Sequence, residues 1–201
     1  MANRPVPRGR VCVFGGAFDP FHKGHAAAIR LLLSDAKFSA VLVVPCGDRP
    51  DKPEITRASD RYQMTKLGVE EIFAGEQRVI VSDLQSSGKV GYATIDLVDY
   101  LVASGVSDLE FAIGSELVRD LPVWREAERL RSAVSFAVFH RPGTALPAFP
   151  DGWQIRSLAP FGAKEGVELS STEIRALIKS GADCAGLVPH SVAEYAKALY
   201  T

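Results

Sequence analysis

The chain of 201 residues has few cysteines and no long hydrophobic run. Its three cysteines, Cys12, Cys46 and Cys184, form no C-x-x-C pair. A disulfide framework or a cysteine-only zinc site is therefore not expected, and the cysteine usage favours a reducing cytoplasm. No apolar stretch approaches the ~18 residues of a membrane span. Residues 1–9 lack the apolar centre of a secretion signal and predict a loose amino-terminal arm.

An excess of charge of one sign is absent too, because 23 Lys and Arg residues oppose 24 Asp and Glu residues. This balance argues against the broad basic surface of a nucleic-acid-binding protein, so we expect neither nucleic acid nor membrane as a partner. The composition is ordinary for a globular protein, at 47% hydrophobic and 23% charged residues. The length predicts one domain over 1–201 and leaves a homo-oligomer open.

Short apolar runs of strand length alternate with segments of helical period. Apolar periodicity predicts helices around 29–36, 64–73, 97–102 and 122–130, the last with Pro122 in its first turn. Two capping-box patterns, Ser170-x-x-Glu173 and Ser191-x-x-Glu194, predict further helices in a carboxyl-terminal part, 170–201. The alternation predicts an α/β fold with a doubly wound, mostly parallel, Rossmann-like sheet of five to six strands. The expected strands are 11–14, 40–44, 79–81, 109–113 and 134–139.

A dense group of special residues lies between the first expected strand and the first helix. Residues 15–25 read Gly-Gly-Ala-Phe-Asp-Pro-Phe-His-Lys-Gly-His. Gly15 and Gly16 allow a sharp turn that presents N–H groups, and the following helix directs its positive dipole end to the same place. His22 and His25 lie three residues apart at that helix start, where both imidazoles can donate to one phosphate, and Gly24 allows a ligand to lie close to the backbone. The segment predicts a phosphate site.

Other interpretations of this segment are weaker than the phosphate site. The ATPase loop G-x-x-x-x-G-K-[S/T] and the dinucleotide pattern G-x-G-x-x-G are both absent. A metal site built on H-x-x-H has no third ligand at a recognisable spacing. A glycine-rich turn with two exposed histidines is the structural alternative, and the number of special residues in one turn argues against it.

A second group of polar residues precedes the helix expected after Ser170. Residues 169–175 read Leu-Ser-Ser-Thr-Glu-Ile-Arg. Unpaired N–H groups and the hydroxyls of Ser171 and Thr172 at a helix start suit an anion, and Arg175 adds a planar guanidinium for phosphate oxygens. An ordinary capped helix with a solvated arginine is the alternative, and on this segment alone it would be preferred.

The two segments resemble the G-G-x-F-D-P-x-H-x-G-H and I-S-S-T-x-I-R motifs of the nicotinate mononucleotide adenylyltransferase family. The shorter H-x-G-H is shared with pantetheine-phosphate adenylyltransferases and cytidylyltransferases. The resemblance implies transfer of the adenylyl group of ATP, with Mg²⁺, to a pyridine mononucleotide in NAD biosynthesis. It implies His22, His25 and Arg175 as catalytic residues. The implied ATP-binding residues are Gly15, Gly16, Phe18, His22, Gly24, His25, Gly114, Glu116, Ser171, Thr172 and Arg175.

The resemblance covers nearly the whole chain and implies acceptor-binding roles for Asp19, Lys52, Thr94 and Trp124. Lys52 stands in the place of the lysine of the family's P-P-H-K loop, although Asp51 replaces the histidine. Thr94 belongs to Ala-Thr-Ile-Asp, which matches the family's Y-T-I-D without the tyrosine, and is expected to cap the next helix. A solvated lysine and a half-buried structural tryptophan are the alternatives for Lys52 and Trp124.

The departures from the family's motifs fall around the acceptor side. Glu116 occupies the aspartate position of I-G-x-D. Met64 matches the methionine of the family's R-x-x-M helix and is expected in the core. Nicotinamide mononucleotide, phosphopantetheine or another phosphorylated acceptor therefore stay as alternatives to nicotinate mononucleotide. An ATP-binding regulator on the same fold is the non-enzymatic alternative.

Overall fold

The computed structural model describes residues 9–49, 53–140, 145–158 and 170–200. Its strands form one sheet with the order β3-β2-β1-β4-β5-β6, and every pairing in it is parallel. The predicted doubly wound α/β class is therefore confirmed. The strands are β1 (Arg10–Gly16), β2 (Ala40–Pro45), β3 (Val79–Val81), β4 (Asp108–Gly114), β5 (Ser135–Phe139) and β6 (Ile155–Ser157).

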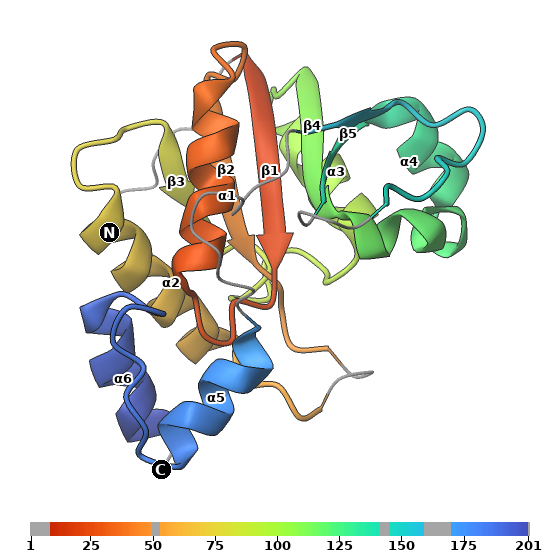
Figure 1. Cartoon of the computed structure of the whole chain (residues 1–201). Coiled ribbons are helices and arrows are strands. Elements are labelled where there is room, and N and C mark those ends of the chain that lie inside the picture. The colour runs from red at the N-terminus through yellow and green to blue at the C-terminus, as the bar shows by residue number, and fades with distance from the viewer. Residues whose placement is uncertain (1–8, 50–52, 141–144, 159–169, 201) are drawn as a thin grey trace.

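Helices cover both faces of the sheet (Figure 1). Apolar side chains of α1 pack on one face, and those of α3, α4 and a 3-10 helix, η1, pack on the other. The helices are α1 (Lys23–Ser34), α2 (Ala58–Ile72), α3 (Thr94–Ala103), η1 (Ser115–Val123), α4 (Ala127–Ala133), α5 (Ser171–Lys179) and α6 (His190–Tyr200).

Two-residue periodicity divides each central strand between two cores. In β1, Val11 and Val13 pack with α3, whereas Cys12 and Phe14 pack with α1. Successive side chains of a strand point to opposite faces, so a strand between two helical layers needs apolar residues on both. This requirement explains why β2, Ala-Val-Leu-Val-Val-Pro, is buried throughout.

The carboxyl-terminal helices form a separate small core with α2. Helix α5 lies beyond the carboxyl end of β1, and α6 packs beside α2 (Figure 1). Met64 of α2 is fully buried there, as expected, and forms one cluster with Ile174 and Ile178 of α5 and with Val192 and Ala196 of α6. The sheet and this core together set the position in space of the first turn of α5.

Two elements differ from the sequence prediction. Strand β6 was not among the predicted strands, because Ile155-Arg156-Ser157 is short and has a charged centre that carries no apolar period. The helix predicted over 122–130 is wrong in its start, since Pro122 lies inside η1 and Trp124 is extended. Glu126 adopts a left-handed conformation with φ 57°, and α4 begins after it.

Two predicted helix caps are also corrected. Ser191 lies inside α6, which begins at His190, and the carboxylate of Glu71 from α2 accepts hydrogen bonds from the first two N–H groups. Thr94 is the first residue of α3 rather than its cap, because Ala93 holds that position. The Ser170 cap is confirmed, as its hydroxyl accepts from the Glu173 N–H at 3.2 Å.

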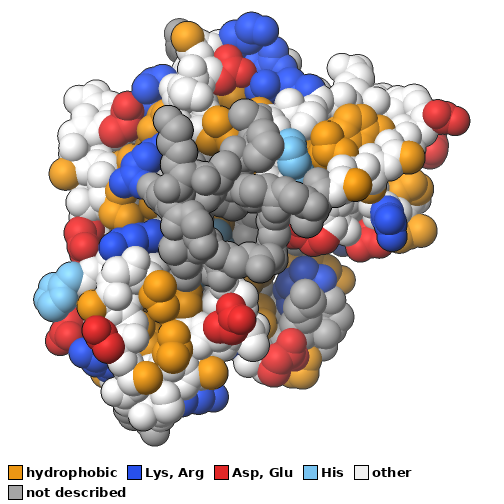
Figure 2. All heavy atoms as spheres, viewed as in Figure 1, with side chains coloured by type: hydrophobic (Ala, Val, Ile, Leu, Met, Phe, Trp, Pro, Cys, Tyr) orange, Lys and Arg blue, Asp and Glu red, His pale blue; other side chains and the backbone are white. Residues whose placement is uncertain are grey.

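Charged side chains of both signs are present on the face of the molecule that Figure 2 shows. On the face in Figure 2, Lys and Arg side chains alternate with Asp and Glu side chains, and hydrophobic groups lie between them. Among the described residues, no helix is long and apolar enough to cross a membrane. All three cysteines are free, with Cys12 and Cys184 buried.

Candidate active site

The site lies where the strand order reverses, between β1 and β4. Pairing of β1 with β2 continues to its last residue, Gly16, opposite Pro45. Pairing of β1 with β4 ends earlier, at Phe14 opposite Ala112. The two strands therefore separate at their carboxyl ends, and ligands of open α/β sheets bind in such a crevice.

Phe18, rather than the glycine pair, makes the turn after β1. Gly15 and Gly16 are the last residues of β1, and neither is among the glycines with positive φ, whereas Phe18 has φ 53°. A Cβ on Gly16 would lie 3.0 Å from the Phe18 ring, which is closer than ordinary contacts allow. Gly16 is thus required by the packing of Phe18. The peptide bond between Asp19 and Pro20 is cis.

His22 and His25 form a stacked pair at the start of α1. Their ring centroids are 3.7 Å apart with an interplanar angle of 23°. The backbone N–H of His22 donates to Nδ1 of His25 at 3.2 Å. An accepting Nδ1 carries no proton, so the neutral His25 ring keeps its proton on Nε2 and presents it as a donor.

Both imidazoles are neutral at physiological pH. Burial lowers the pKa of His22 to about 4, and burial together with the neighbouring His22 lowers the pKa of His25 well below its usual value. The rings of Phe14, Phe18 and Phe21 surround His25 with centroid distances of 6.3, 4.8 and 5.6 Å. Apolar surroundings disfavour the charged imidazolium, and hydrogen-bond donation remains.

His22 differs from the exposed histidine of the alternative interpretation. Its side chain is buried, with 6% of its surface exposed. Within the described residues its Nδ1 has no hydrogen-bond partner. A buried polar atom without a partner is costly unless a ligand or water meets it, which is common at functional sites. Lys23, between the two histidines, is exposed.

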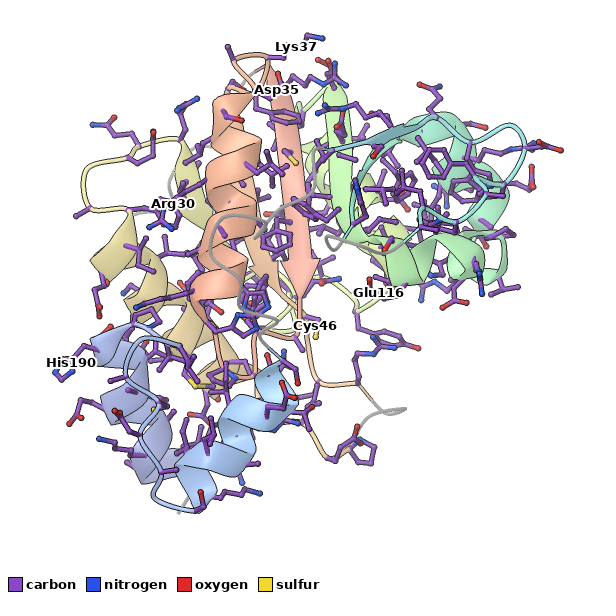
Figure 3. All side chains as sticks on the ribbon, in the orientation of Figure 1. Arg30, Asp35, Lys37, Cys46, Glu116 and His190 are labelled. Atoms are coloured by element: carbon purple, nitrogen blue, oxygen red, sulfur yellow. The ribbon has the colours of Figure 1, made fainter. Side chains whose placement is uncertain are left out.

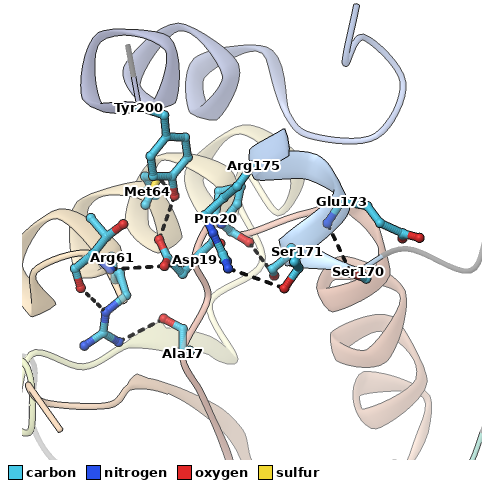
Figure 4. Close-up of polar contacts among 12 residues, drawn as sticks. Ala17, Asp19, Pro20, Arg61, Met64, Ser170, Ser171, Glu173, Arg175 and Tyr200 are labelled. Carbon is cyan, nitrogen blue, oxygen red and sulfur yellow. Dashed lines mark hydrogen bonds and ion pairs between the residues drawn. The ribbon is translucent and has the colours of Figure 1, made fainter. Parts of the chain in front are cut away.

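The start of α5 contacts the first motif directly (Figure 4). The Ser171 hydroxyl donates to the Pro20 carbonyl at 3.3 Å. Nη1 of Arg175 donates to the Asp19 carbonyl at 2.6 Å, and its Nη2 lies 3.3 Å from Oγ1 of Thr172. Segments about 150 residues apart in the chain therefore meet at one place. Thr172 is exposed and Arg175 is half-buried beside it.

Arg61 holds the loops around the site, a role that sequence reasoning missed. Its guanidinium is fully buried and donates to the carbonyls of Ala17 at 3.0 Å and Gly47 at 2.9 Å. Its Nε donates to the Thr56 carbonyl at 2.7 Å. One side chain of α2 thus connects the loop after β1 with the loop after β2. The R-x-x-M motif marks the position of Arg61, but no sequence pattern distinguishes a buried arginine from a solvated one.

Gly114 and Glu116 lie at the end of β4. The Glu116 carboxylate folds back over Gly114 and occupies the place of a Cβ on that residue. Figure 3 shows Glu116 and Cys46 toward the carboxyl-end edge of the sheet, whereas Asp35 and Lys37 lie at the opposite edge. Two residues with an expected ATP role, Gly114 and Glu116, are therefore on the same side of the sheet as the histidines.

Of the four expected acceptor residues, the structure describes Asp19, Thr94 and Trp124. Thr94 begins α3, and Trp124 packs edge-on against Phe136 with centroids 6.2 Å apart. An ion pair between Asp96 and Arg125 connects the start of α3 with the segment at Trp124. Lys52 lies outside the described residues, together with Asp51 and Leu169.

Asp19 is buried and engaged within the protein. It is 1% exposed. Its carboxylate accepts hydrogen bonds from the Tyr200 hydroxyl at 2.6 Å and from the Thr56 N–H at 3.1 Å (Figure 4). These contacts tie the Asp19 side chain to α6 and to the residues before α2. Within the described residues, no group of three or more His, Cys, Asp and Glu side chains is arranged to hold a metal ion.

Comparisons with known proteins show the family of the chain. A family model described as cytidylyltransferase-like matches residues 13–177. A Shouchella clausii protein named "Probable nicotinate-nucleotide adenylyltransferase" is 34% identical over 175 residues, covering 86% of this chain and 85% of its own. A Thermus thermophilus protein of the same name is 33% identical over 187 residues, covering 92% and 95%.

A solved structure shows the same fold. It is described as "Plasmodium falciparum nicotinic acid mononucleotide adenylyltransferase complexed with NaAD", and it matches with a TM-score of 0.75 at 21% identity. The match covers 93% of this chain and 94% of that one. The family model extends over the motif segment at the start of α1 and reaches α5. The chain thus belongs to the nicotinate-nucleotide adenylyltransferase family, within the cytidylyltransferase-like proteins.

Proposed function

We propose that the protein transfers the adenylyl group of ATP to nicotinate mononucleotide, giving deamido-NAD and pyrophosphate. The convergence of the two helix starts carries this proposal. Arg175 and Ser171 of α5 donate to the carbonyls of Asp19 and Pro20, so the start of α5 lies against the segment that leads into His22 and His25. The names of the bacterial relatives support the same reaction.

The reaction is a single displacement at phosphorus. An oxygen of the mononucleotide 5′-phosphate attacks the α-phosphorus of ATP and forms a new P–O bond. The bond from the α-phosphorus to the bridging oxygen breaks, and that oxygen leaves with its electron pair as part of pyrophosphate. No covalent enzyme intermediate is required, because positioning and charge stabilisation account for most catalysis in such transfers.

His25 and His22 are proposed as neutral donors to the phosphate oxygens. Nε2–H of His25 suits the oxygen on which charge builds as pyrophosphate leaves, since its Nδ1 is already engaged by the His22 N–H. Preorganised donors in a site from which water is excluded stabilise such charge without reorganising. Phe14, Phe18 and Phe21 supply the apolar surroundings of His25.

The start of α5 is proposed to hold the β- and γ-phosphates. Free N–H groups at a helix start and the hydroxyls of Ser171 and Thr172 offer donors to phosphate oxygens. Arg175 adds a fixed positive charge. Gly15 and Gly24 are proposed to leave room for the nucleotide beside the backbone. Gly16 is proposed to contact it through its backbone, and Gly114 and Glu116 from the end of β4.

Mg²⁺ is proposed to arrive with ATP, held by phosphate oxygens and water. The donor set fits this mode. Asp19, the acidic residue inside the motif, already receives hydrogen bonds from Tyr200 and Thr56, and Glu116 is the exposed carboxylate at the end of β4. Magnesium commonly binds to nucleotide-using proteins through substrate phosphates with few protein ligands. The bound ion would neutralise charge on the triphosphate.

The acceptor is proposed to lie between the start of α3 and the segment of Trp124. The ion pair between Asp96 and Arg125 holds these two segments together, which supports a shared subsite for Thr94 and Trp124. The Gln85 side chain donates to the Gly91 carbonyl at 2.8 Å and orders the approach to α3. Lys52 is proposed to contact phosphate, on the resemblance to the family's P-P-H-K loop alone.

A pyrophosphate-release assay with ATP and Mg²⁺ tests the proposal. Nicotinate mononucleotide is expected to give faster release than nicotinamide mononucleotide or phosphopantetheine. In the variant His25→Ala turnover should fall about 100- to 1000-fold, which is the effect of losing one preorganised donor. Faster pyrophosphate release with another acceptor would identify that acceptor as the substrate. Tight ATP binding without pyrophosphate release would favour the ATP-binding regulator.

A further inference from the structure

The buried carboxylate of Asp19 is the point where three separate elements meet. Its Oδ1 accepts from the hydroxyl of Tyr200 at the end of α6, at 2.6 Å. Its Oδ2 accepts from the Thr56 N–H before α2, at 3.1 Å, and lies 3.6 Å from Nη1 of Arg175 in α5. Figure 4 shows the phenol and the guanidinium approaching Asp19 from different helices.

This arrangement divides the charge of one carboxylate between several partners. A buried carboxylate is stable only when donors or cations compensate it, and Asp19 is 1% exposed. The Tyr200 hydroxyl remains protonated and donating, because burial and the adjacent Asp19 raise its pKa. The phenol therefore takes a share of the negative charge that would otherwise act only on Arg175 and the Thr56 N–H.

The packing of α6 explains how Tyr200 reaches this place. Val192 and Ala196 of α6 are buried against α2 and α5 in the small carboxyl-terminal core. The Tyr200 hydroxyl also lies 3.8 Å from Sδ of Met64, so the phenol is held between α2 and the motif. The end of α6 is thus fixed relative to Asp19 and not merely near it.

We propose that Tyr200 is a positioning residue for Arg175. By donating to Asp19, it holds the carboxylate in one orientation and limits its pull on the guanidinium. Arg175 then stays on the Asp19 carbonyl, 2.6 Å away, with its charge available to the triphosphate. Without the hydroxyl, Oδ1 of Asp19 loses its donor, and the carboxylate competes with ATP for Arg175. This inference rests on the ATP site of the proposed function.

The test compares Tyr200→Phe with a matched control, Tyr195→Phe. Tyr195 lies in the same helix and donates to a carboxylate of α2, Oδ1 of Asp60, at 2.8 Å. Both variants lose one phenol hydroxyl that bonds to an aspartate, but only Tyr200 contacts the motif. ATP affinity by calorimetry should weaken about tenfold in Tyr200→Phe, as for loss of a hydrogen bond to a charged group. It should stay within twofold of wild type in Tyr195→Phe.

A second comparison separates positioning from loosening of α6. In an Arg175→Ala background, Tyr200→Phe is expected to change ATP affinity by less than twofold, because the residue on which it acts is gone. A tenfold loss that persists in this background, or an equal loss in Tyr195→Phe, would overturn the inference. Urea unfolding of both single variants checks that their stabilities fall by similar amounts.

The outcomes distinguish this inference from the proposed function. ATP binding is measured without acceptor, so it does not depend on the acceptor's identity or on turnover. Wild-type protein that binds ATP but releases no pyrophosphate would refute the reaction and leave the Tyr200 result meaningful. Full turnover with unchanged ATP affinity and KM in Tyr200→Phe would refute the positioning role alone.

Discussion

At the scale of single residues, burial decides what the two motif histidines can do. An exposed histidine titrates near neutral pH and carries charge in part of the population. His22 is stacked on His25 within a group of aromatic rings, and the lowered pKa of each keeps both neutral. In the proposed reaction their contribution is therefore directed hydrogen bonding, and the fixed positive charge would come from Arg175 and from the cation that binds with ATP.

The lowered pKa of His22 predicts a pH-dependent stability. Unfolded His22 titrates near 6.5 and the folded residue at about 4, so between these values the unfolded chain binds more protons. The free energy of unfolding therefore falls as the pH falls through this window. His22→Gln should reduce the difference between pH 7 and pH 5 by about 2 kcal/mol. Urea unfolding at the two pH values measures it, and an unchanged difference would contradict the lowered pKa.

At the scale of elements, the ends of helices carry both stability and function. Helix α5 uses its own Ser170 as cap, which leaves Ser171, Thr172 and Arg175 at its start to face the motif. Helix α6 takes its cap from another helix, because Glu71 of α2 accepts from the N–H groups of His190 and Ser191 at 2.9 and 2.8 Å. Its first turn is thus tied to α2, and its last turn reaches Asp19.

The borrowed cap predicts unequal effects of two glutamates. Glu71→Ala removes the acceptor for two N–H groups at the start of α6 and should lower the free energy of unfolding by about 1 kcal/mol, as for other lost caps. Glu194→Ala removes the partner of the capping box that the sequence predicted and should cost only a few tenths of a kcal/mol. Urea denaturation measures the free energy of unfolding of both variants. A larger loss in Glu194→Ala than in Glu71→Ala would support the capping box that the sequence predicted.

At the scale of the whole molecule, stability and chemistry lie at opposite edges of the sheet. Glu110 of β4 is fully buried and pairs with Arg10 of β1 and with Arg156 of β6, the latter at 2.6 Å. Arg156 also contacts Asp35 beyond the end of α1 at 3.0 Å. The network connects β1, β4 and β6 at the edge away from the crevice, where Figure 3 shows Asp35.

This separation predicts a variant that loses stability without losing function. Arg156→Met leaves the buried Glu110 with a single cationic partner and should lower the free energy of unfolding by about 3 kcal/mol. The KM values for ATP and acceptor should stay within twofold of wild type. Arg131→Met is the control, because Arg131 pairs with the exposed Glu128 and such surface pairs contribute about 0–1 kcal/mol. Equal losses in both variants would refute the buried network.

The sequence by itself determined the layered fold and the two segments of the site. Periodicity is a local property, so the runs 11–14 and 40–44 and the helices after them could be recognised without contacts. The density of glycine, histidine and hydroxyl residues in 15–25 and 170–175 indicated phosphate chemistry for the same reason. Strand β6 was not predicted, because a three-residue strand with a charged central residue shows no apolar periodicity.

Only the tertiary structure decided which polar side chains face the crevice and which hold it in shape. Asp19 lies inside the first motif and Arg61 in the R-x-x-M helix, but the sequence does not show that both are buried and hold loops by hydrogen bonds to distant backbone. Tyr200 and Glu71 act on segments far from them in the chain. Burial and contacts across the chain depend on how elements pack, and a linear pattern of residue types contains no measure of either.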